Sequence, residues 1–402
     1  MTTVPSAAPS KIQDRHDSFD HSPRPVRGAT GQRAPNHLLY VDSMRGVAVC
    51  GVIATHLAFL LSTTGLLAKI MHLGMYGVQL FYLVSALTLM MSMAKRNHLE
   101  RYPALNFFIR RFFRIAPAFY LTILVYCLWN TARGSLSWSH LLLVMTFLNG
   151  WRPDLINNAP VIGQWSIAVE MTFYLVLPLL FAGLRSFRSV LIAWYVSVAV
   201  YPLFFPLAAR LAAWEGFAHN TLGEFGYYWF PSQLPVFLTG MALYFIHAKK
   251  RNLWRSVLPF IPGAILLTVM NFRLRDPLLT PVIGVGGMIF VSLAAKYSPR
   301  IVVNQFFARV GEVSFSAYLC HTLVLILLVP FFKPHAARFP LMTFTAAYAA
   351  SLPIVFTISS VSWRLIEKPG QRLGKLCIQQ IASRLLPVEP TTGPAYANTR
   401  LN

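Results

Sequence analysis

The sequence predicts an all-α protein, a bundle of about ten transmembrane helices with both termini in the cytoplasm. Hydrophobic residues make up 55% of the 402-residue chain, charged residues only 12%, and the mean hydropathy is +0.53. Soluble globular proteins average about 45–50% apolar and about 25% charged residues. Basic residues gather between the apolar segments, which is typical of the cytoplasmic loops of membrane proteins. A polytopic membrane protein in contact with the lipid bilayer is therefore expected.

Ten apolar segments have about the length that a helix needs to cross the hydrocarbon core. They are residues 38–62, 73–94, 115–132, 165–184, 188–208, 230–247, 256–272, 279–296, 310–332 and 342–366. An eleventh segment, 138–151, is shorter, and if it crossed, the basic cluster 249–255 would lie outside, against the positive-inside rule. We therefore expect 138–151 to be a partial or re-entrant segment on the outer side. Pro369, after Glu367 and Lys368, is expected to end the last helix.

The regions outside these crossings are expected to be tails. Residues 1–36 are rich in Pro, Ser, Arg, His and Asp and contain no apolar core of the signal-peptide kind, which predicts a disordered cytoplasmic tail. Residues 37–370 then form the transmembrane domain, and 371–402 form a short cytoplasmic tail. The expected location is the inner (cytoplasmic) membrane, as a multi-pass protein. The net charge of +22 would also suit nucleic acid, but the basic residues are placed as loop residues, so no nucleic-acid partner is expected.

Arg45 and His56 are the first candidate site residues, because both fall inside the first apolar segment. Eleven residues correspond to almost three helical turns, so the two side chains share a face and lie roughly 16 Å apart along the axis. Charged and titratable residues at membrane depth are costly and usually face a binding site or a proton path. The four cysteines include no CxxC pair, and no metal site is indicated.

Arg111 and Arg114, one helical turn apart in the segment FFIRRFFRIAP, are the second candidates. Guanidinium groups bind phosphate through a planar fork of donors and stay charged. The same residues could instead be a cytoplasmic stop signal whose side chains reach the lipid headgroups. Arg45, on the same expected side, favours an anion site.

Glu170, with Trp165 before it and Tyr174 one turn after it, is the third candidate. We expect it at a depth comparable with His56, where a carboxylate could orient an imidazole that acts as a general base. A structural ion pair, or a carboxylate favoured near a helix N-terminus, is the alternative reading. Tyr318 and His321, on one face of a later helix with Ser314, form a further polar stripe. His321 could be a second catalytic group or a hydrogen-bonded packing residue.

Five motifs, in order, are similar to those of acyltransferase family 3, the integral membrane O-acyltransferases. They are 40–46 (YVDSMRG) continuing to His56, 77–85 (GVQLFYLVS), 111–117 (RFFRIAP), 165–174 (WSIAVEMTFY), and 311–321 (GEVSFSAYLCH) followed by 366–369 (IEKP). Each motif is weak alone, whereas their joint order is specific. They cover roughly residues 38–370.

The resemblance implies an activity and assigns residues to it. In that family the Arg and His of the first helix and the paired arginines are associated with activity, which here are Arg45, His56, Arg111 and Arg114. Members move acyl groups, most often acetyl from acetyl-CoA, to hydroxyls of glycans such as lipopolysaccharide, exopolysaccharide or peptidoglycan. Others acylate lipid-linked sugars or small secondary metabolites. Some carry an extracytoplasmic hydrolase-like domain that is not found here, so transfer is expected to end within the membrane part or to be handed to a separate protein.

Two family positions differ. A usual Gly is Ser43 here and another is Ala86, both small changes that affect helix packing more than chemistry.

The expected mechanism places the CoA phosphates on the three arginines and the thioester near His56. His56, oriented by Glu170, would take the proton of the acceptor hydroxyl, and Trp165, Tyr174, Tyr318 or His321 would line the acceptor cavity. Transient acylation of His56 is equally compatible with the sequence. A transporter or flippase of a sugar or lipid-linked substrate is the alternative from another class, although no internal repeat supports it.

Overall fold

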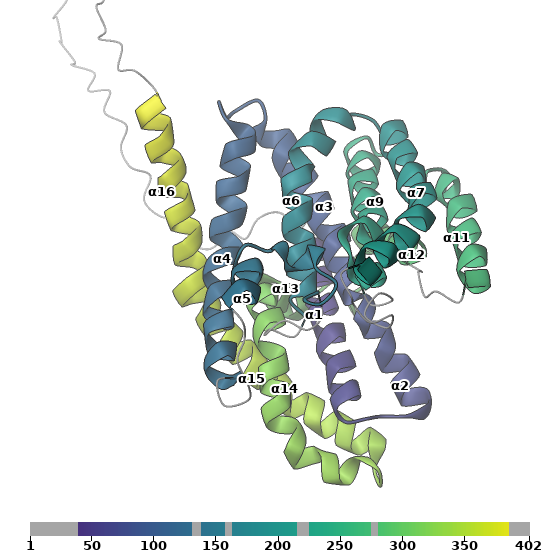
Figure 1. The fold of residues 1–402 in the computed structure, drawn as a ribbon, viewed down its shortest axis with the longest axis vertical. Coiled ribbons are helices and arrows are strands. Elements are labelled where there is room, and N and C mark those ends of the chain that lie inside the picture. Colours follow the sequence, from purple (N-terminus) through teal and green to yellow (C-terminus); the bar gives the residue numbers. More distant parts are fainter. Residues whose placement is uncertain (1–38, 131–137, 157–162, 215–224, 275–279, 386–402) are drawn as a thin grey trace, which may run out of the picture. The chain divides into compact units, whose positions relative to one another are not determined.

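The computed structural model describes residues 39–130, 138–156, 163–214, 225–274 and 280–385 (Figure 1). Within these ranges the regular structure is helical throughout, without a strand. The tail expected at 1–36 lies outside the described residues, and so does the part of the expected 371–402 tail that follows residue 385. Helix α16 continues across the expected domain boundary at residue 370 to Leu385.

The helices follow the apolar segments closely. Their bounds are α1 Leu39–Leu60, α2 Gly65–His72, η1 Leu73–Tyr76, α3 Gly77–Arg96, α4 Pro103–Asn130, α5 Trp138–Met145, η2 Leu148–Trp151, α6 Trp165–Gly183, α7 Phe187–Trp214, α9 Phe230–Ala248, α10 Leu253–Val257, η3 Leu258–Phe260, α11 Ile261–Leu274, α12 Thr280–Tyr297, α13 Gln305–Glu312, α14 Ser314–Ala336, α15 Pro340–Ser362, η4 Trp363–Glu367 and α16 Lys368–Leu385.

Seven stretches of the described chain are long and apolar enough to cross a membrane, as expected of a multi-pass membrane protein. They are Leu39–Leu60, Gly65–Arg96, Pro103–Trp129, Trp165–Gly183, Thr280–Tyr297, Ser314–Ala336 and Pro340–Ser383. The other three predicted crossings coincide with the helices α7, α9 and α11. The total of ten and the cytoplasmic placement of both termini remain predictions. Helix α5 has only eight residues, too few to span the bilayer.

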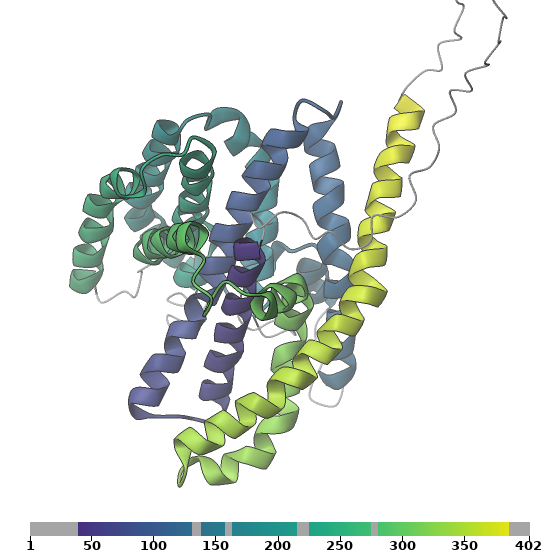
Figure 2. The same ribbon diagram turned by 180° about the vertical axis from the view of Figure 1, so that it is seen from behind.

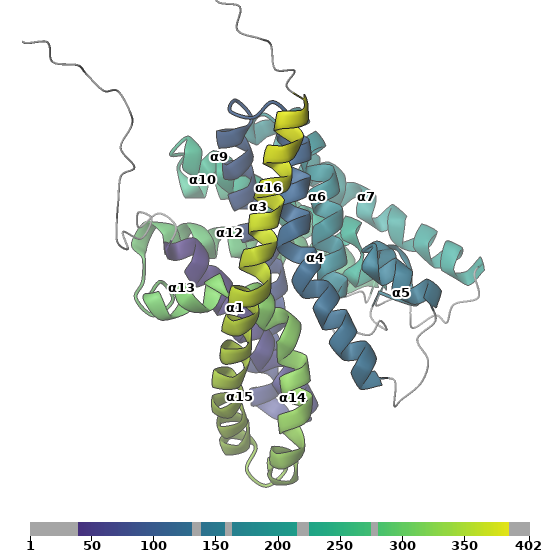
Figure 3. The ribbon, with the colours of Figure 1, turned by 90° about the vertical axis from the view of Figure 1, so that its left-hand side faces the viewer.

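Helix α1 lies against α3, α13 and α14, and α13 crosses its first turns (Figure 3). Two glycines permit this crossing. A Cβ added at Gly46 would lie 2.0 Å from the Phe307 carbonyl oxygen, and one added at Gly311 would lie 1.9 Å from the Asp42 carbonyl oxygen. Small residues let helix backbones approach this closely in membrane proteins. The contact fixes the rotation of α1 and thereby the direction in which its polar side chains point.

The C-terminal helices form one bent rod, in which α15 passes through the π-helical turn η4 into α16 (Figure 2). The expectation that Pro369 ends the last helix is therefore wrong. Pro369 is the second residue of α16, and proline is tolerated in the first turn of a helix because its missing N–H has no intrahelical partner there. Gly370 and Gly374 let α16 pack along α4, where added Cβ atoms would meet Phe113.

The turn between α3 and α4 is held by Glu100. Its carboxylate accepts hydrogen bonds from Arg96 at 3.1 Å, from Arg110 at 2.8 Å and from Asn106 at 3.0 Å. Partial burial raises the pKa of Glu100, but these hydrogen bonds outweigh the effect of burial, and the net pKa is lowered. The ion pair with Arg110 fixes the start of α4, the helix that carries Arg111 and Arg114.

Candidate active site

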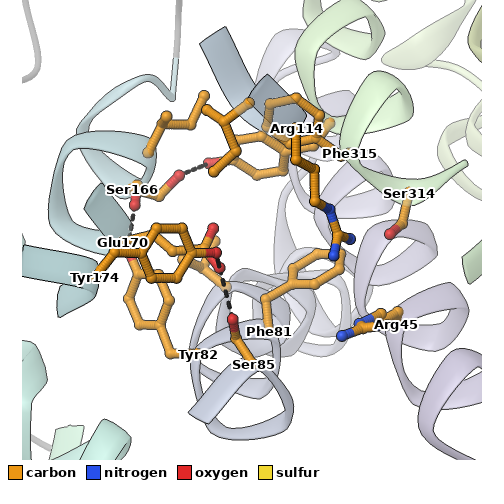
Figure 4. Close-up of a pocket in the computed structure, with 14 residues that line it drawn as sticks. Arg45, Phe81, Tyr82, Ser85, Arg114, Ser166, Glu170, Tyr174, Ser314 and Phe315 are labelled. Atoms are coloured by element: carbon orange, nitrogen blue, oxygen red, sulfur yellow. Dashed lines mark hydrogen bonds between the residues drawn. The ribbon is translucent and has the colours of Figure 1, made fainter. Parts of the chain in front are cut away.

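A small cavity of about 70 Å³ lies among α1, α3, α4, α6 and α14 (Figure 4). Its lining is Arg45, Val78, Phe81, Tyr82, Ser85, Arg114, Ile115, Ser166, Ile167, Glu170, Tyr174, Ser314, Phe315 and Tyr318. Residues from five different helices therefore line one cavity. Two guanidinium groups project from one side of the cavity, and a carboxylate projects from the other.

Arg45 is held in place by two neighbours. Its Nη1 donates to Asp42 Oδ1 at 3.2 Å, one turn earlier on α1, and its Nη2 donates to Thr88 Oγ1 of α3 at 3.2 Å. The Arg45 side chain is 19% exposed and that of Asp42 is 32% exposed. The ion pair offsets part of the charge of Arg45, and the bond to Thr88 aims the guanidinium into the cavity.

Arg114 reaches the same cavity from α4, and neither it nor Arg111 has a carboxylate within ion-pair distance in the described chain. Arg111 does not line the cavity. Its guanidinium lies 6.0 Å from the centre of the Phe107 ring, its Nε is buried without a hydrogen-bond partner, and it interacts electrostatically with Arg45, Arg114 and Glu170. Buried guanidinium groups without matching acids are costly and indicate a site for an anion.

Glu170 faces the arginines across the cavity. Its Oε1 accepts hydrogen bonds from Ser85 Oγ at 2.7 Å and from Tyr174 OH at 2.5 Å. No described cation lies within ion-pair distance of it, so a gap separates the carboxylate from Arg45 and Arg114. The lining of the cavity has one carboxylate and two guanidinium groups, whereas Asp42 pairs with Arg45 from outside the lining. The positive charge of the lining favours an anionic ligand.

Tyr318 forms the boundary between this cavity and a second polar group. Its hydroxyl donates to the Gly163 carbonyl at 2.9 Å and accepts from Ser166 Oγ at 2.7 Å. Its backbone carbonyl accepts from His321 Nδ1 at 2.7 Å. Tyr318 therefore connects the arginine cavity to His321 through a single residue.

His56 and His321 form a hydrogen-bonded pair, with 2.7 Å between His56 Nδ1 and His321 Nε2. The ring centroids are 4.9 Å apart and the planes differ by 16°, so the imidazoles are nearly coplanar and joined nitrogen to nitrogen. A separation of 2.7 Å is too short for face-to-face stacking and is that of a hydrogen bond.

The hydrogen-bond partners determine the tautomers of this pair. A carbonyl oxygen only accepts, so His321 Nδ1 carries the hydrogen that it donates to the Tyr318 carbonyl. His321 is 0% exposed, and an unpaired charge there would be costly, so the ring is neutral and its Nε2 is an acceptor. His56 Nδ1 then donates, and the lone pair of neutral His56 is on Nε2. No described residue is hydrogen-bonded to that nitrogen, which is the arrangement that a general base requires.

His56 and Glu170, which were expected to contact each other, have different partners in the structure. His56 bonds to His321, and Glu170 bonds to Ser85 and Tyr174. The sequence places His56 and Glu170 at comparable depth, but helix rotation turns them toward different neighbours.

The structure brings most of the sequence-predicted residues to the arginine cavity or to the histidine pair, and leaves Trp165 outside both. Arg45, Arg114, Glu170, Tyr174 and Tyr318 line the cavity. Trp165 does not line it; this side chain is buried and packs on Tyr228, with 4.4 Å between ring centroids. In the described ranges no three His, Cys, Asp or Glu side chains gather as metal ligands.

Sequence reasoning missed Ser85, Thr88 and Thr322, whose hydroxyls contact Glu170, Arg45 and His321 respectively. Ser85 lies within one of the five motifs and could have been singled out there. For Thr88 and Thr322 no local signal distinguishes a site hydroxyl from a helix-packing one.

Comparisons with known proteins agree with the motifs. The sequence profile of a family described as an acyltransferase domain matches residues 38–361. The chain is 23% identical over 376 residues to the peptidoglycan O-acetyltransferase OatA of Listeria monocytogenes, covering 83% of this chain and 56% of the relative. It is 22% identical over 391 residues to a putative O-acetyltransferase of Staphylococcus aureus strain COL, covering 87% and 60% respectively. The chain thus spans less than two thirds of the length of these relatives. No solved structure matches it significantly.

Proposed function

Because the chain belongs to the acyltransferase-domain family, we propose that it is a membrane-bound O-acyltransferase. It moves an acyl group, acetyl in the first instance, from acyl-CoA to a hydroxyl of a cell-surface or lipid-linked glycan in the inner membrane. The observation that carries this proposal is the pair of arginines, Arg45 and Arg114, that line one cavity in which Glu170 is the single carboxylate of the lining.

The donor fits the arginine cavity through its phosphates. Arg45 and Arg114 point into one space, and Arg111 adds positive charge behind them. A cavity of about 70 Å³ admits one phosphate group or the end of the pantetheine arm, so most of CoA would lie outside it. His56 is eleven residues further along α1, roughly 16 Å from Arg45, a distance that the extended pantetheine arm can span. Glu170 limits the cavity charge and positions Tyr174 and Ser85.

His56 acts as the general base of the reaction. Its Nε2 takes the proton of the acceptor hydroxyl as that oxygen attacks the thioester carbonyl carbon. The carbon–sulfur bond then breaks, the acyl group remains on the acceptor oxygen, and the CoA thiolate leaves and receives the proton. His321 holds His56 in the tautomer that leaves Nε2 available. His321 is therefore a positioning residue, comparable in role to the group that orients the base in other acyl-transfer sites.

A glycan acceptor is favoured by the relatives. One of them is named a peptidoglycan O-acetyltransferase, and others are named putative O-acetyltransferases. A polysaccharide hydroxyl is a weak nucleophile at neutral pH, and a positioned base contributes typically 10²–10⁴-fold to such a proton transfer. The His56 pair supplies that base.

The test is acyl transfer by the purified, detergent-solubilised full chain, with radiolabelled acetyl-CoA as donor and crude envelope glycan as acceptor. We expect wild-type protein to release thiol and label the glycan, His56→Ala to lose both while still binding CoA, and Arg114→Ala to bind CoA at least tenfold more weakly.

Two matched variants control this experiment, His72→Ala and Arg101→Ala. Both residues are exposed and lie outside the site, so both variants should behave as wild type. Wild-type protein that neither binds CoA nor transfers label would refute the proposal, and transport assays would follow.

A further inference from the structure

Two buried amide side chains, Asn149 and Gln164, have no hydrogen-bond partner in the part of the chain that the structure describes. Asn149 is 1% exposed and Gln164 is 2% exposed. In both, the side-chain oxygen and nitrogen are buried, and none of these four atoms is hydrogen-bonded to another group among the described residues. Buried polar groups are almost always paired, and an unpaired amide forfeits the hydrogen bonds that it makes with water in the unfolded chain. Two such amides call for a partner that is not part of the chain.

The two amides belong to one contact, between η2 and the start of α6. Gly150, next to Asn149, approaches α6 so closely that a Cβ on it would lie 3.0 Å from Ala168 Cβ. Gln164 is four residues before Ala168, which is one helical turn along the same face of α6. Asn149 and Gln164 therefore belong to two segments that pack on each other, here called the seam, at the end of α6 that also carries Ser166 of the cavity wall.

Aromatic rings surround this seam. Trp151, two residues after Asn149, is 46% exposed and packs edge to face on Trp229 with 5.7 Å between ring centroids. Trp165, directly after Gln164, packs on Tyr228. The indole of Trp151 thus presents a partly open apolar face beside amide groups that can both donate and accept.

This combination matches the chemistry of one class of ligand. A sugar has C–H faces that pack on aromatic rings, and it has adjacent hydroxyls that donate and accept at the same time, as amides do. A lipid chain would leave the amides unpaired, and a phosphate would accept from the amide nitrogens but leave the amide oxygens unpaired.

We propose that Asn149 and Gln164, with Trp151 beside them, bind the sugar ring of the acceptor. This inference rests on the proposed function, since it names the acceptor class of the same site. Gln164 adjoins Gly163, whose carbonyl accepts from Tyr318, and the Tyr318 carbonyl in turn accepts from His321. Hydrogen bonds through Gly163 and Tyr318 thus connect the residue next to Gln164 with His321, the partner of His56.

The test replaces each amide by an apolar side chain of similar size, in Asn149→Leu and Gln164→Met. Thermal unfolding in detergent is measured first. Because no protein hydrogen bond is lost and a buried polar group is removed, we expect the melting temperature of both variants to be unchanged or raised. Gln233→Met is the matched control: Gln233 is 0% exposed, donates to the Tyr227 carbonyl at 2.6 Å and accepts from Gln79 at 3.1 Å, so its loss should lower the melting temperature.

Binding and transfer are measured next with the crude envelope glycan. We expect the glycan concentration for half-maximal transfer to rise tenfold or more in both amide variants, with the half-saturating acetyl-CoA concentration unchanged. Quenching of tryptophan fluorescence by the same glycan, without donor, should weaken in parallel. A lower melting temperature in the amide variants would show that the amides pair within the folded protein and would overturn the inference.

The outcomes separate this inference from the proposed function. If wild-type protein transfers label and the amide variants keep its glycan dependence, the inference fails and the acyltransferase function stands. If wild-type protein transfers nothing, the proposed function fails, and fluorescence decides the sugar site: quenching that the variants lose supports it, whereas no quenching of wild type overturns it.

Discussion

Replacing His321 by Phe should slow acyl transfer without impairing donor binding. The substitution keeps a ring of similar size in a fully buried position and removes both nitrogens. His56 Nδ1–H then loses the acceptor that lies 2.7 Å away, so the tautomer with the proton on Nε2 is no longer disfavoured. The Tyr318 carbonyl loses the imidazole N–H but remains within helix α14, where a backbone N–H can still pair with it.

The magnitude follows from the hydrogen bonds lost. One neutral hydrogen bond contributes about 0.5–1.5 kcal/mol net, which alone changes the tautomer ratio by roughly 2–13-fold. Loss of ring orientation adds to this, within the roughly 10²–10⁴-fold that a general base contributes in total. We expect kcat to fall about 10–100-fold, the KM for acetyl-CoA to stay within about twofold, and the unpaired His56 N–H to reduce stability by about 1–3 kcal/mol.

The assay is thiol release at saturating glycan and donor, compared among His321→Phe, His321→Gln and His56→Ala. The Gln side chain retains a carbonyl oxygen that can accept from His56, so it should recover part of the lost kcat, which a purely structural role would not predict. Thr322→Val, which removes a weaker 3.2 Å contact to the same nitrogen, should have a small effect. Wild-type kcat in His321→Phe would refute the reasoning. A loss as complete as that of His56→Ala, without recovery in His321→Gln, would instead make His321 the base.

Three further predictions concern packing and charge. Gly311→Ala should lower the free energy of unfolding by more than about 2 kcal/mol, because the added Cβ would lie 1.9 Å from the Asp42 carbonyl oxygen. Gly286→Ala is the control and should leave stability unchanged, because an added Cβ there has no atom within 4 Å. Thermal unfolding of the two variants makes the comparison. Glu170→Gln should tighten CoA binding severalfold in calorimetry, because it removes the carboxylate facing the arginines; weaker binding would contradict this. Glu100→Gln should lower the melting temperature modestly near neutral pH. The difference from wild type should shrink as the pH falls through the lowered pKa of Glu100, because a carboxyl whose pKa is lowered by folding stabilises only while ionised. A difference that persists at low pH would show that charge is not its cause.

Much of the fold could be predicted from the sequence because membrane helices are set by local properties. An apolar run of sufficient length predicts a helix wherever it occurs, and each of the ten predicted crossings coincides with one. The prediction that the last helix ends at Pro369 was wrong for a local reason as well. Proline is compatible with the first turn of a helix, and here the π-helical turn η4 leads directly into α16, of which Pro369 is the second residue.

Some residues of the candidate site could likewise be predicted from the sequence, and others could not. Arg45 and Glu170 could be named because each is a charged residue in an apolar segment, where burial without purpose is costly. Arg114 could be named because it lies one helical turn from Arg111, directly before such a segment. The residues that hydrogen-bond to them could not be named from the sequence. Ser85 and Thr88 differ from other hydroxyl residues only in the groups that they contact, and Asn149 and Gln164 are notable only because their amides lack a hydrogen-bond partner among the described residues.

The sequence by itself determined that the chain is a multi-pass helical membrane protein and that one helix carries an arginine and a histidine on a single face. Only the tertiary structure decided which groups meet. His56 pairs with His321, 265 residues away, rather than with Glu170. The physical reason is that depth along a helix follows from residue spacing, whereas rotation about its axis follows from contacts between helices, such as that of Gly311 with the backbone of α1. Those contacts join distant parts of the chain, and they turn two imidazoles toward each other and the carboxylate toward the arginines.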